Sequence, residues 1–234
     1  MRSKYELIAE RLKPFGFERI SLHEDAVVVS RYAMDGHLRQ GVQLVEHSAT
    51  NTKVSLTVGY DVLDRIGDDD PRKAQTLSVD VRRVNRLGDV DILDSRRMDE
   101  YLGWECDEVE AIADVAVKYG VPWLDSWADP HKIIQFILDD IVAREAAVAK
   151  WNAEAAKEIT FWQRLRGQRK PDPFYRPRGS PPIYQNILAN LYLYIGNKQE
   201  AVKYLANVCA AHPRWKVHHD KLEELRKPLG QQAG

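Results

Sequence analysis

The sequence predicts an α+β protein with a four-stranded antiparallel sheet, covering helices and a C-terminal helical extension. Three observations support this class. Residues 26–60 alternate between apolar and polar side chains, as half-buried strands do. Residues 107–142 repeat apolar residues at helical spacing, and a proline-rich stretch at residues 167–182 precedes a helical C-terminus. With 234 residues, 44% of them hydrophobic, the chain can bury a sizeable core.

The first predicted elements are a short helix and a meander of three strands. The amphipathic helix ends at Pro14 and Gly16, which cannot continue it. Three antiparallel strands follow within residues 26–60. Asp35 and Gly36 predict the tight turn between the first two strands, because both residues tolerate positive φ.

A fourth strand and two helices complete the predicted α+β region. Residues 76–84 alternate in polarity and predict the fourth strand. Asp107 is the predicted N-cap of a helix that ends at Gly120. Asp129, followed by proline, predicts the start of a second helix. This helix either continues as one long helix or breaks near Lys150.

The predicted organisation has four parts. Residues 1–142 form the α+β domain, 143–166 a helical connector, 167–182 a basic proline-rich linker, and 183–234 a helical hairpin with a C-terminal helix. The hairpin resembles a single tetratricopeptide unit. The matching positions are Leu188, Ala189, Tyr192, Gly196, Ala201, Leu205 and Pro213. A lone repeat cannot bury its own apolar face, so it is expected to pack on the rest of the protein or on another copy.

Composition sets limits on partners and compartment. The formal net charge is -1, so any electrostatic partner has to be attracted by a local patch. No long apolar run is present, and the charged N-terminus lacks the apolar core of a secretory signal, so no membrane association is expected. Cys106 and Cys209 are too few and too far apart for a disulfide scaffold. The expectation is a cytoplasmic protein.

Common enzyme motifs are absent from the sequence. It contains no P-loop, dinucleotide fingerprint, zinc-protease helix or nucleophile elbow. Asp125 and Asp129 flank Trp127 and are candidates for a carboxylate pair, but an N-cap role already explains Asp129. Trp123 and Trp127 are expected in the core and at the rim of the sheet-helix junction. No catalytic residue and no cofactor are therefore predicted.

Metal sites are also not predicted. The histidines near the first predicted hairpin are His23, His37 and His47. They lack the close spacing of zinc ligands, and the adjacent His218 and His219 are expected to point apart on a helix. Five aspartates within residues 61–71 suggest calcium, but the loop lacks the terminal glutamate of a calcium site. A solvated loop between strands is the expected structure.

The most distinctive surface feature is a basic and aromatic stretch at residues 161–182, with six Arg or Lys residues against one Asp. Its predicted contact residues are Trp162, Arg164, Arg166, Arg169, Lys170, Tyr175, Arg176 and Arg178. Arginine forks pair with carboxylates or phosphates, and aromatic rings anchor interfaces or stack on bases. The alternative is a solvated linker whose aromatic residues pack on the core.

Several short motifs occur in a fixed order. They are Leu12-Lys13-Pro14-Phe15-Gly16-Phe17, Val29-Ser30-Arg31-Tyr32, Val42-Gln43, Arg86-Leu87-Gly88 and Val121-Pro122-Trp123-Leu124-Asp125. Over about residues 4–140 this order resembles an uncharacterised bacterial family with L-K-x-x-G-F, R-[IL]-G and [VI]-P-[FW]-L-[DE] motifs. That family often has paired tryptophans after R-[IL]-G, where this chain has Trp104 alone. The resemblance implies a fold and no catalytic residue.

These observations lead to ranked functional hypotheses. The first is a non-enzymatic module that binds a protein with an acidic surface, with a toxin-neutralising (immunity) protein as a concrete form. The second is nucleic-acid binding through residues 161–182, which the near-neutral charge of the chain makes less favoured. The third is an enzyme of unrecognised type with His23, Asp125 and the tryptophans in a cleft. An unmatched hairpin face is also compatible with a homodimer.

Overall fold

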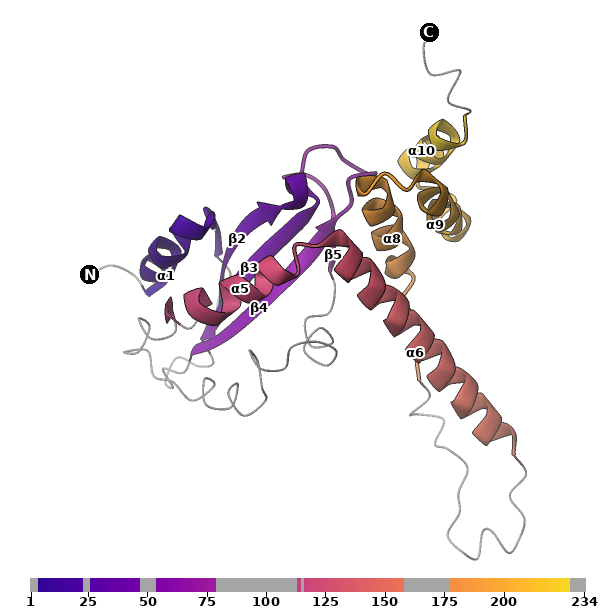
Figure 1. The fold of residues 1–234 in the computed structure, drawn as a ribbon, viewed down its shortest axis with the longest axis horizontal. Helices are drawn as coiled ribbons and strands as arrows, with labels where there is room; N and C mark the ends of the chain where they lie inside the picture. The colour runs from indigo at the N-terminus through magenta and orange to yellow at the C-terminus, as the bar shows by residue number, and fades with distance from the viewer. Residues whose placement is uncertain are drawn as a thin grey trace, which may run out of the picture.

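The computed structural model describes most of the chain. The described residues are 4–22, 26–46, 54–78, 113–114, 116–157 and 177–227. They form one antiparallel sheet, with helices on one face of it and a group of C-terminal helices at one end (Figure 1). The α+β class is therefore confirmed.

The sheet is a five-stranded antiparallel meander rather than the four-stranded sheet predicted. Its strands, in spatial order, are β1 (Arg19–Leu22), β2 (Ala26–Ala33), β3 (Leu38–Glu46), β4 (Val54–Leu63) and β5 (Thr76–Ser78). The unpredicted strand is β1, which pairs with β2 from Arg19 opposite Ser30 to Leu22 opposite Val27. Its four residues are too few for alternation to stand out, and Ile20 at this edge is half exposed.

The turn between β2 and β3 adopts the predicted conformation. Asp35 and Gly36 have φ angles of 51° and 82°, and Met34 shares this region with a φ of 52°. Ala33 pairs with Leu38, which closes the hairpin. The Asp-Gly signal was thus sufficient to locate this turn.

One face of the sheet forms the core with the helices that precede α6. The N-terminal helix α1 (Lys4–Leu12) and helix α5 (Val121–Ser126) both belong to this layer. Ile8 of α1, Val42 of β3 and Leu124 of α5 are buried in a single hydrophobic cluster. Burial of this apolar surface is the main force that holds the two layers together. Gln40 is also buried, and its amide donates to the Leu124 carbonyl oxygen.

Gly120 does not end a helix, contrary to the sequence-based prediction. A π-helical turn, η4 (Ala116–Gly120), leads directly into α5, and Gly120 has the helical angles φ −67° and ψ −47°. Pro122 lies in the first turn of α5, a position at which the fixed φ of proline suits a helix. Trp123 and Trp127 are both buried, so the expected core position is confirmed and the expected rim position is not. The predicted N-cap Asp107 lies outside the described residues.

Helix α6 (Pro130–Ala156) is one continuous helix of 27 residues, so the chain does not break near Lys150. The Asp129 side chain accepts a hydrogen bond from the backbone N–H of His131 at 2.9 Å, which confirms the predicted N-cap. The first half of α6 buries Ile133, Phe136 and Ile137. Its second half extends away from the sheet (Figure 1).

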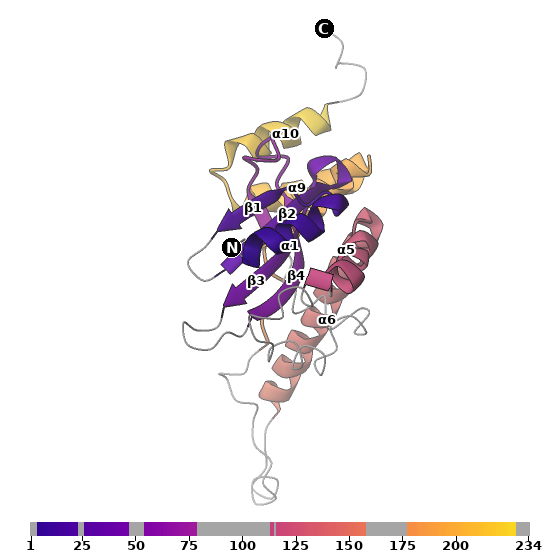
Figure 2. The same ribbon diagram turned by 90° about the vertical axis from the view of Figure 1, so that its left-hand side faces the viewer.

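Three helices end the described chain: α8 (Ile183–Tyr194), α9 (Lys198–Ala211) and α10 (Lys216–Arg226). Figures 1 and 2 show them gathered at one end of the sheet. The helical hairpin is confirmed, and Gly196 between α8 and α9 has a φ of 77°. Helix α8 packs against β4, β5 and α6, and its buried residues belong to the same cluster as those of the sheet. The hairpin face is therefore covered by the rest of the protein.

Candidate functional site

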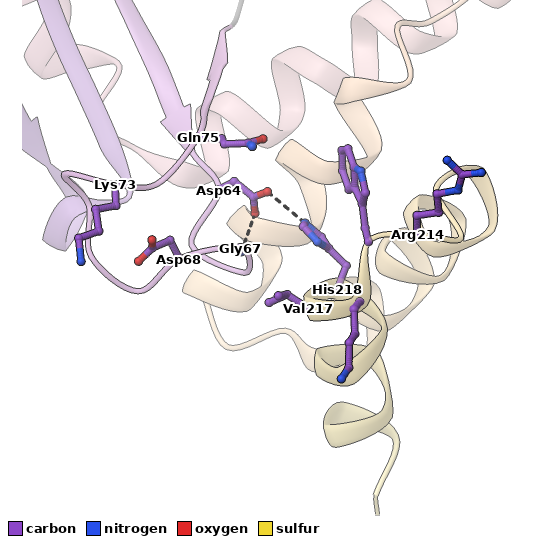
Figure 3. A pocket seen from close by; sticks show the side chains of 10 residues that line it. Asp64, Gly67, Asp68, Lys73, Gln75, Arg214, Val217 and His218 are labelled. Atoms are coloured by element: carbon purple, nitrogen blue, oxygen red, sulfur yellow. Dashed lines mark hydrogen bonds and ion pairs between the residues drawn. The ribbon is translucent and has the colours of Figure 1, made fainter.

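The candidate site is a hollow of about 470 Å³ where the C-terminal helices meet the end of the sheet (Figure 3). We call it the first hollow. Its walls come from the loop between β4 and β5, from the segment that joins α9 to α10, and from the first residues of α10. The lining residues are Asp64, Gly67, Asp68, Lys73, Gln75, Arg214, Trp215, Lys216, Val217 and His218.

Asp64 lies at the floor of the first hollow and is only 2% exposed. Its Oδ1 accepts from the backbone N–H of Gly67 and from the Asn190 amide, both at 3.2 Å. Its Oδ2 accepts from the Asn186 amide and from His218 Nε2, both at 3.0 Å. Each carboxylate oxygen offers about two acceptor positions, so these four donors fill the hydrogen-bonding capacity of the group.

Helix α8 supplies two of these donors because Asn186 and Asn190 lie four residues apart on its buried face. Asn190 also links the helix to the loop backbone. Its Oδ1 accepts from the N–H groups of Arg65 and Ile66, at 2.8 and 3.2 Å. This one side chain therefore satisfies two buried backbone donors as well as Asp64.

His218 brings α10 into the same network. It is 6% exposed, and its Nε2 donates to Asp64 because an ionised carboxylate can only accept. Burial alone would raise the pKa of Asp64. The hydrogen bonds from His218, Asn186 and Asn190 together outweigh burial and lower the pKa of Asp64 below its ordinary value. The charged form of the carboxylate is thus stabilised, and we call these four residues the Asp64 cluster.

The rim of the first hollow combines apolar and cationic side chains. Trp215 is 37% exposed and Val217 is 52% exposed. Lys73 and Arg214 lie on opposite sides of the hollow in Figure 3, and Lys216 completes the set of cations. Among the residues that the structure describes, neither Arg214 nor Lys216 forms a side-chain ion pair. Within the described part of the chain, these two cations of the rim are therefore not paired with a carboxylate.

The Trp215 ring is held in place by two histidines. His212 stacks on it with a centroid distance of 4.1 Å and an interplanar angle of 10°. The His218 ring is 4.9 Å away and tilted by 44°. The position of Trp215 is thus coupled to the buried cluster through His218, while part of the indole remains open to solvent.

The chemistry of the first hollow favours binding over proton transfer. A general base or a metal ligand needs a free lone pair, and the Asp64 carboxylate has its lone pairs occupied.

Within the described part of the chain, no group of three histidine, cysteine or acidic side chains is placed to hold a metal ion. No described helix is both long and apolar enough to cross a bilayer.

Two sequence-based expectations about this region were incomplete. Residues 61–71 were expected to form a solvated loop between strands, and residues from Asp64 onward do lie between β4 and β5, but Asp64 is buried. His218 and His219 were expected to point apart on a helix, and both lie on α10, but the prediction did not include the hydrogen bond of His218 to Asp64. The reason in both cases is that the partners are separated by 154 residues in the chain, so no local pattern connects them.

The remaining predicted residues do not gather at the first hollow. Asp125 pairs with Arg31 on the surface. His37 lies near β3, whereas His23 and His47 are outside the described residues. Arg178 is exposed just before α8. The other seven residues of the predicted basic surface are likewise outside the described residues: Trp162, Arg164, Arg166, Arg169, Lys170, Tyr175 and Arg176.

One signal in the sequence could have indicated the cluster. Helix α8 reads IYQNILANLYLY, in which two asparagines four residues apart lie on a face that is otherwise apolar. A buried polar side chain requires a hydrogen-bonding partner, so this spacing predicts a polar group opposite α8. It does not say which residue that group belongs to.

Comparisons with known proteins add no further assignment. No protein-family model, no curated protein and no solved structure matched this chain. The resemblance to an uncharacterised bacterial family remains a prediction from its motifs.

Proposed function

We propose that the protein is a non-enzymatic protein-binding module and that the first hollow is its contact surface for an acidic partner. One observation carries this proposal: Trp215 and Val217 are exposed beside cations without ion pairs, above a floor whose carboxylate is already saturated. Tryptophan and arginine are the residues most enriched among those that dominate binding energy at protein interfaces.

The charge of the rim supports an acidic partner. Three cations line the hollow: Lys73, Arg214 and Lys216. Of the two aspartates in the lining, only Asp68 can offset their charge toward a partner, because Asp64 is enclosed in its hydrogen-bond network. Complementary charges at the rim of an interface mainly raise the association rate and depend on ionic strength. The apolar groups between them supply the area that a partner would bury.

A protein partner is favoured over a nucleic acid at this surface. Base stacking needs a free aromatic face, and His212 already covers one face of Trp215. The basic stretch at residues 161–182 remains a second proposed contact for the same acidic partner. A narrower form of the proposal is a toxin-neutralising protein, in which case the toxin presents the acidic surface.

The test is affinity capture by the tagged full-length chain from a cell lysate, with and without nuclease, followed by kinetics with the purified partner. The double variant Arg214→Glu/Lys216→Glu is expected to bind at least about tenfold more weakly, mainly through slower association. Val217→Ser is expected to raise the dissociation rate. Trp215 is left unchanged because its ring contacts His218.

The matched control is Lys150→Glu/Lys198→Glu, which reverses the same charge at exposed positions away from the hollow. It is expected to keep the wild-type association rate. Capture that disappears on nuclease treatment would replace this proposal with nucleic-acid binding. An unchanged rate for Arg214→Glu/Lys216→Glu would remove the first hollow from it.

A further inference from the structure

A second hollow of about 410 Å³ is lined by other residues of the loop that follows β4. Asp64 faces the first hollow and the next residue, Arg65, faces the second. The second hollow also receives Asp35 and His37 from the β2–β3 hairpin, and Tyr194 from the end of α8. Its volume falls in the range of small-molecule sites.

The guanidinium of Arg65 has no carboxylate partner among the residues that the structure describes. Among the described residues it forms no ion pair, and its only side-chain hydrogen bond is a long one of 3.4 Å to the Gly36 carbonyl oxygen. Arg65 Nε is buried without a partner. A partly buried guanidinium with unused donors is unfavourable unless an acceptor is supplied.

Negative charge lines the same hollow but does not neutralise Arg65. Asp35 and Asp69 both face the hollow, yet neither forms an ion pair with Arg65. Burial, and then the charge of the nearby Asp35, raises the pKa of Tyr194. The hollow therefore holds separated charges of both signs, and a ligand with both signs would bridge them.

The remaining wall combines apolar side chains with the polar Asn190 and the cationic Lys221. Leu193 and Ile66 line the hollow, and the ring of His37 lies 4.6 Å from that of Tyr194. Burial first, and then the nearby Arg65, lowers the pKa of His37, so this ring is neutral at neutral pH. Lys221 is already paired with Glu224 at 3.1 Å.

From this arrangement we infer that the second hollow binds a small zwitterion of the α-amino-acid class. The ligand carboxylate pairs with the planar fork of Arg65. Its ammonium group faces Asp35 and Asp69, and its apolar side chain packs against Leu193 and Ile66. A phosphate dianion fits less well, because two aspartates face the same space.

The experiment is isothermal titration of the full-length protein with L-leucine, L-phenylalanine and the other free amino acids, each to about 10 mM. N-acetyl-L-leucine, which lacks the ammonium charge, and L-leucinamide, which lacks the carboxylate, are titrated as matched analogues. At least one free amino acid is expected to bind, and its N-acetyl and amide analogues are expected to bind at least about tenfold more weakly.

Two variants assign the binding to this hollow. Arg65→Gln and Asp35→Asn are each expected to weaken it at least about tenfold, and asparagine tolerates the positive φ of 51° at position 35. Arg72→Gln removes an exposed arginine from the same loop and is expected to bind as the wild type does. Thermal unfolding of each variant checks that it is folded.

Three results would overturn the inference. They are the absence of heat for every free amino acid, equal affinity for the N-acetyl analogue, and unchanged binding in folded Arg65→Gln. Amino-acid binding is tested independently of the protein partner. Arg214→Glu/Lys216→Glu alters only the first hollow, whereas Arg65 and Asp35 line only the second.

Discussion

Helix α8 donates hydrogen bonds to two buried aspartates that have very different surroundings. Asp64 accepts from Asn186, Asn190, His218 and a backbone N–H, none of which is a permanent cation. Asp140, on α6, accepts from the Tyr184 hydroxyl at 2.8 Å and from Arg144 at 2.7 Å. We call Asp140, Arg144 and Tyr184 the Asp140 cluster.

The two aspartates differ in which groups stabilise the buried carboxylate charge. Arg144 is four residues from Asp140 on the same helix, so this ion pair forms as soon as α6 is helical. Asp64 depends on donors from α8 and α10, which reach it only when the whole C-terminal group is docked. The Asp64 cluster should therefore report on docking, whereas the Asp140 cluster is partly a local property of α6.

The largest expected effect is that of Asp64→Ala. The substitution leaves the buried Asn186, Asn190 and His218 without their common acceptor, and we expect a loss of about 3–5 kcal/mol in the free energy of unfolding. Urea unfolding followed by circular dichroism measures it. Asp69→Ala, an exposed aspartate of the same loop, is the control and should change stability by less than about 0.5 kcal/mol. Equal losses in the two variants would contradict a structural role for the Asp64 cluster.

Acid should weaken the same cluster without removing the side chain, so the expected effect is smaller. The pKa of Asp64 is lower in the folded protein than its ordinary value of 3.8, so the folded state binds fewer protons than the unfolded state. This contribution to stability is present above pH 3.8 and is lost as the pH falls through the lowered pKa.

Urea unfolding between about pH 5 and about pH 2 checks this prediction. The stability difference between the wild type and Asp64→Asn is expected to shrink as the pH falls. Asp69→Asn is the matched control for the loss of one carboxylate. A wild-type advantage that stays constant over this range would show that the charge of Asp64 does not stabilise the fold.

The fold was predictable wherever the signal is local. Asp35 and Gly36 located a turn, and Asp129 with Pro130 located the start of α6, because a cap or a turn depends on adjacent residues. The short edge strand β1 escaped prediction because four residues carry little periodicity. The prediction for Gly120 was wrong because glycine often ends helices. Here Gly120 has helical angles and joins the π-helical turn η4 to α5.

The candidate site was not predictable for the opposite reason. Asp64 and His218 are each ordinary polar residues in their local sequence, and only the tertiary fold brings them to 3.0 Å. The exposed pair Trp215 and Val217 has the same origin, since their exposure depends on how α10 docks. In this chain, helices, strands and turns follow from neighbouring residues, whereas the first hollow depends on contacts between the β4–β5 loop and the C-terminal helices.

The smallest expected effect is at the Asp140 cluster. Tyr184→Phe removes the hydroxyl that donates to Asp140 but leaves Arg144 paired with the carboxylate, so we expect a loss of about 1–2 kcal/mol by urea unfolding. Combining Tyr184→Phe with Asp64→Ala then tests how α8 is held. The hydrogen bonds that the structure describes for the two clusters have no side chain in common, so their effects should add to within about 0.5 kcal/mol. A deviation from additivity larger than this would mean that α8 docks as one unit. Loss of its hydrogen bonds to either aspartate would then already break those to the other.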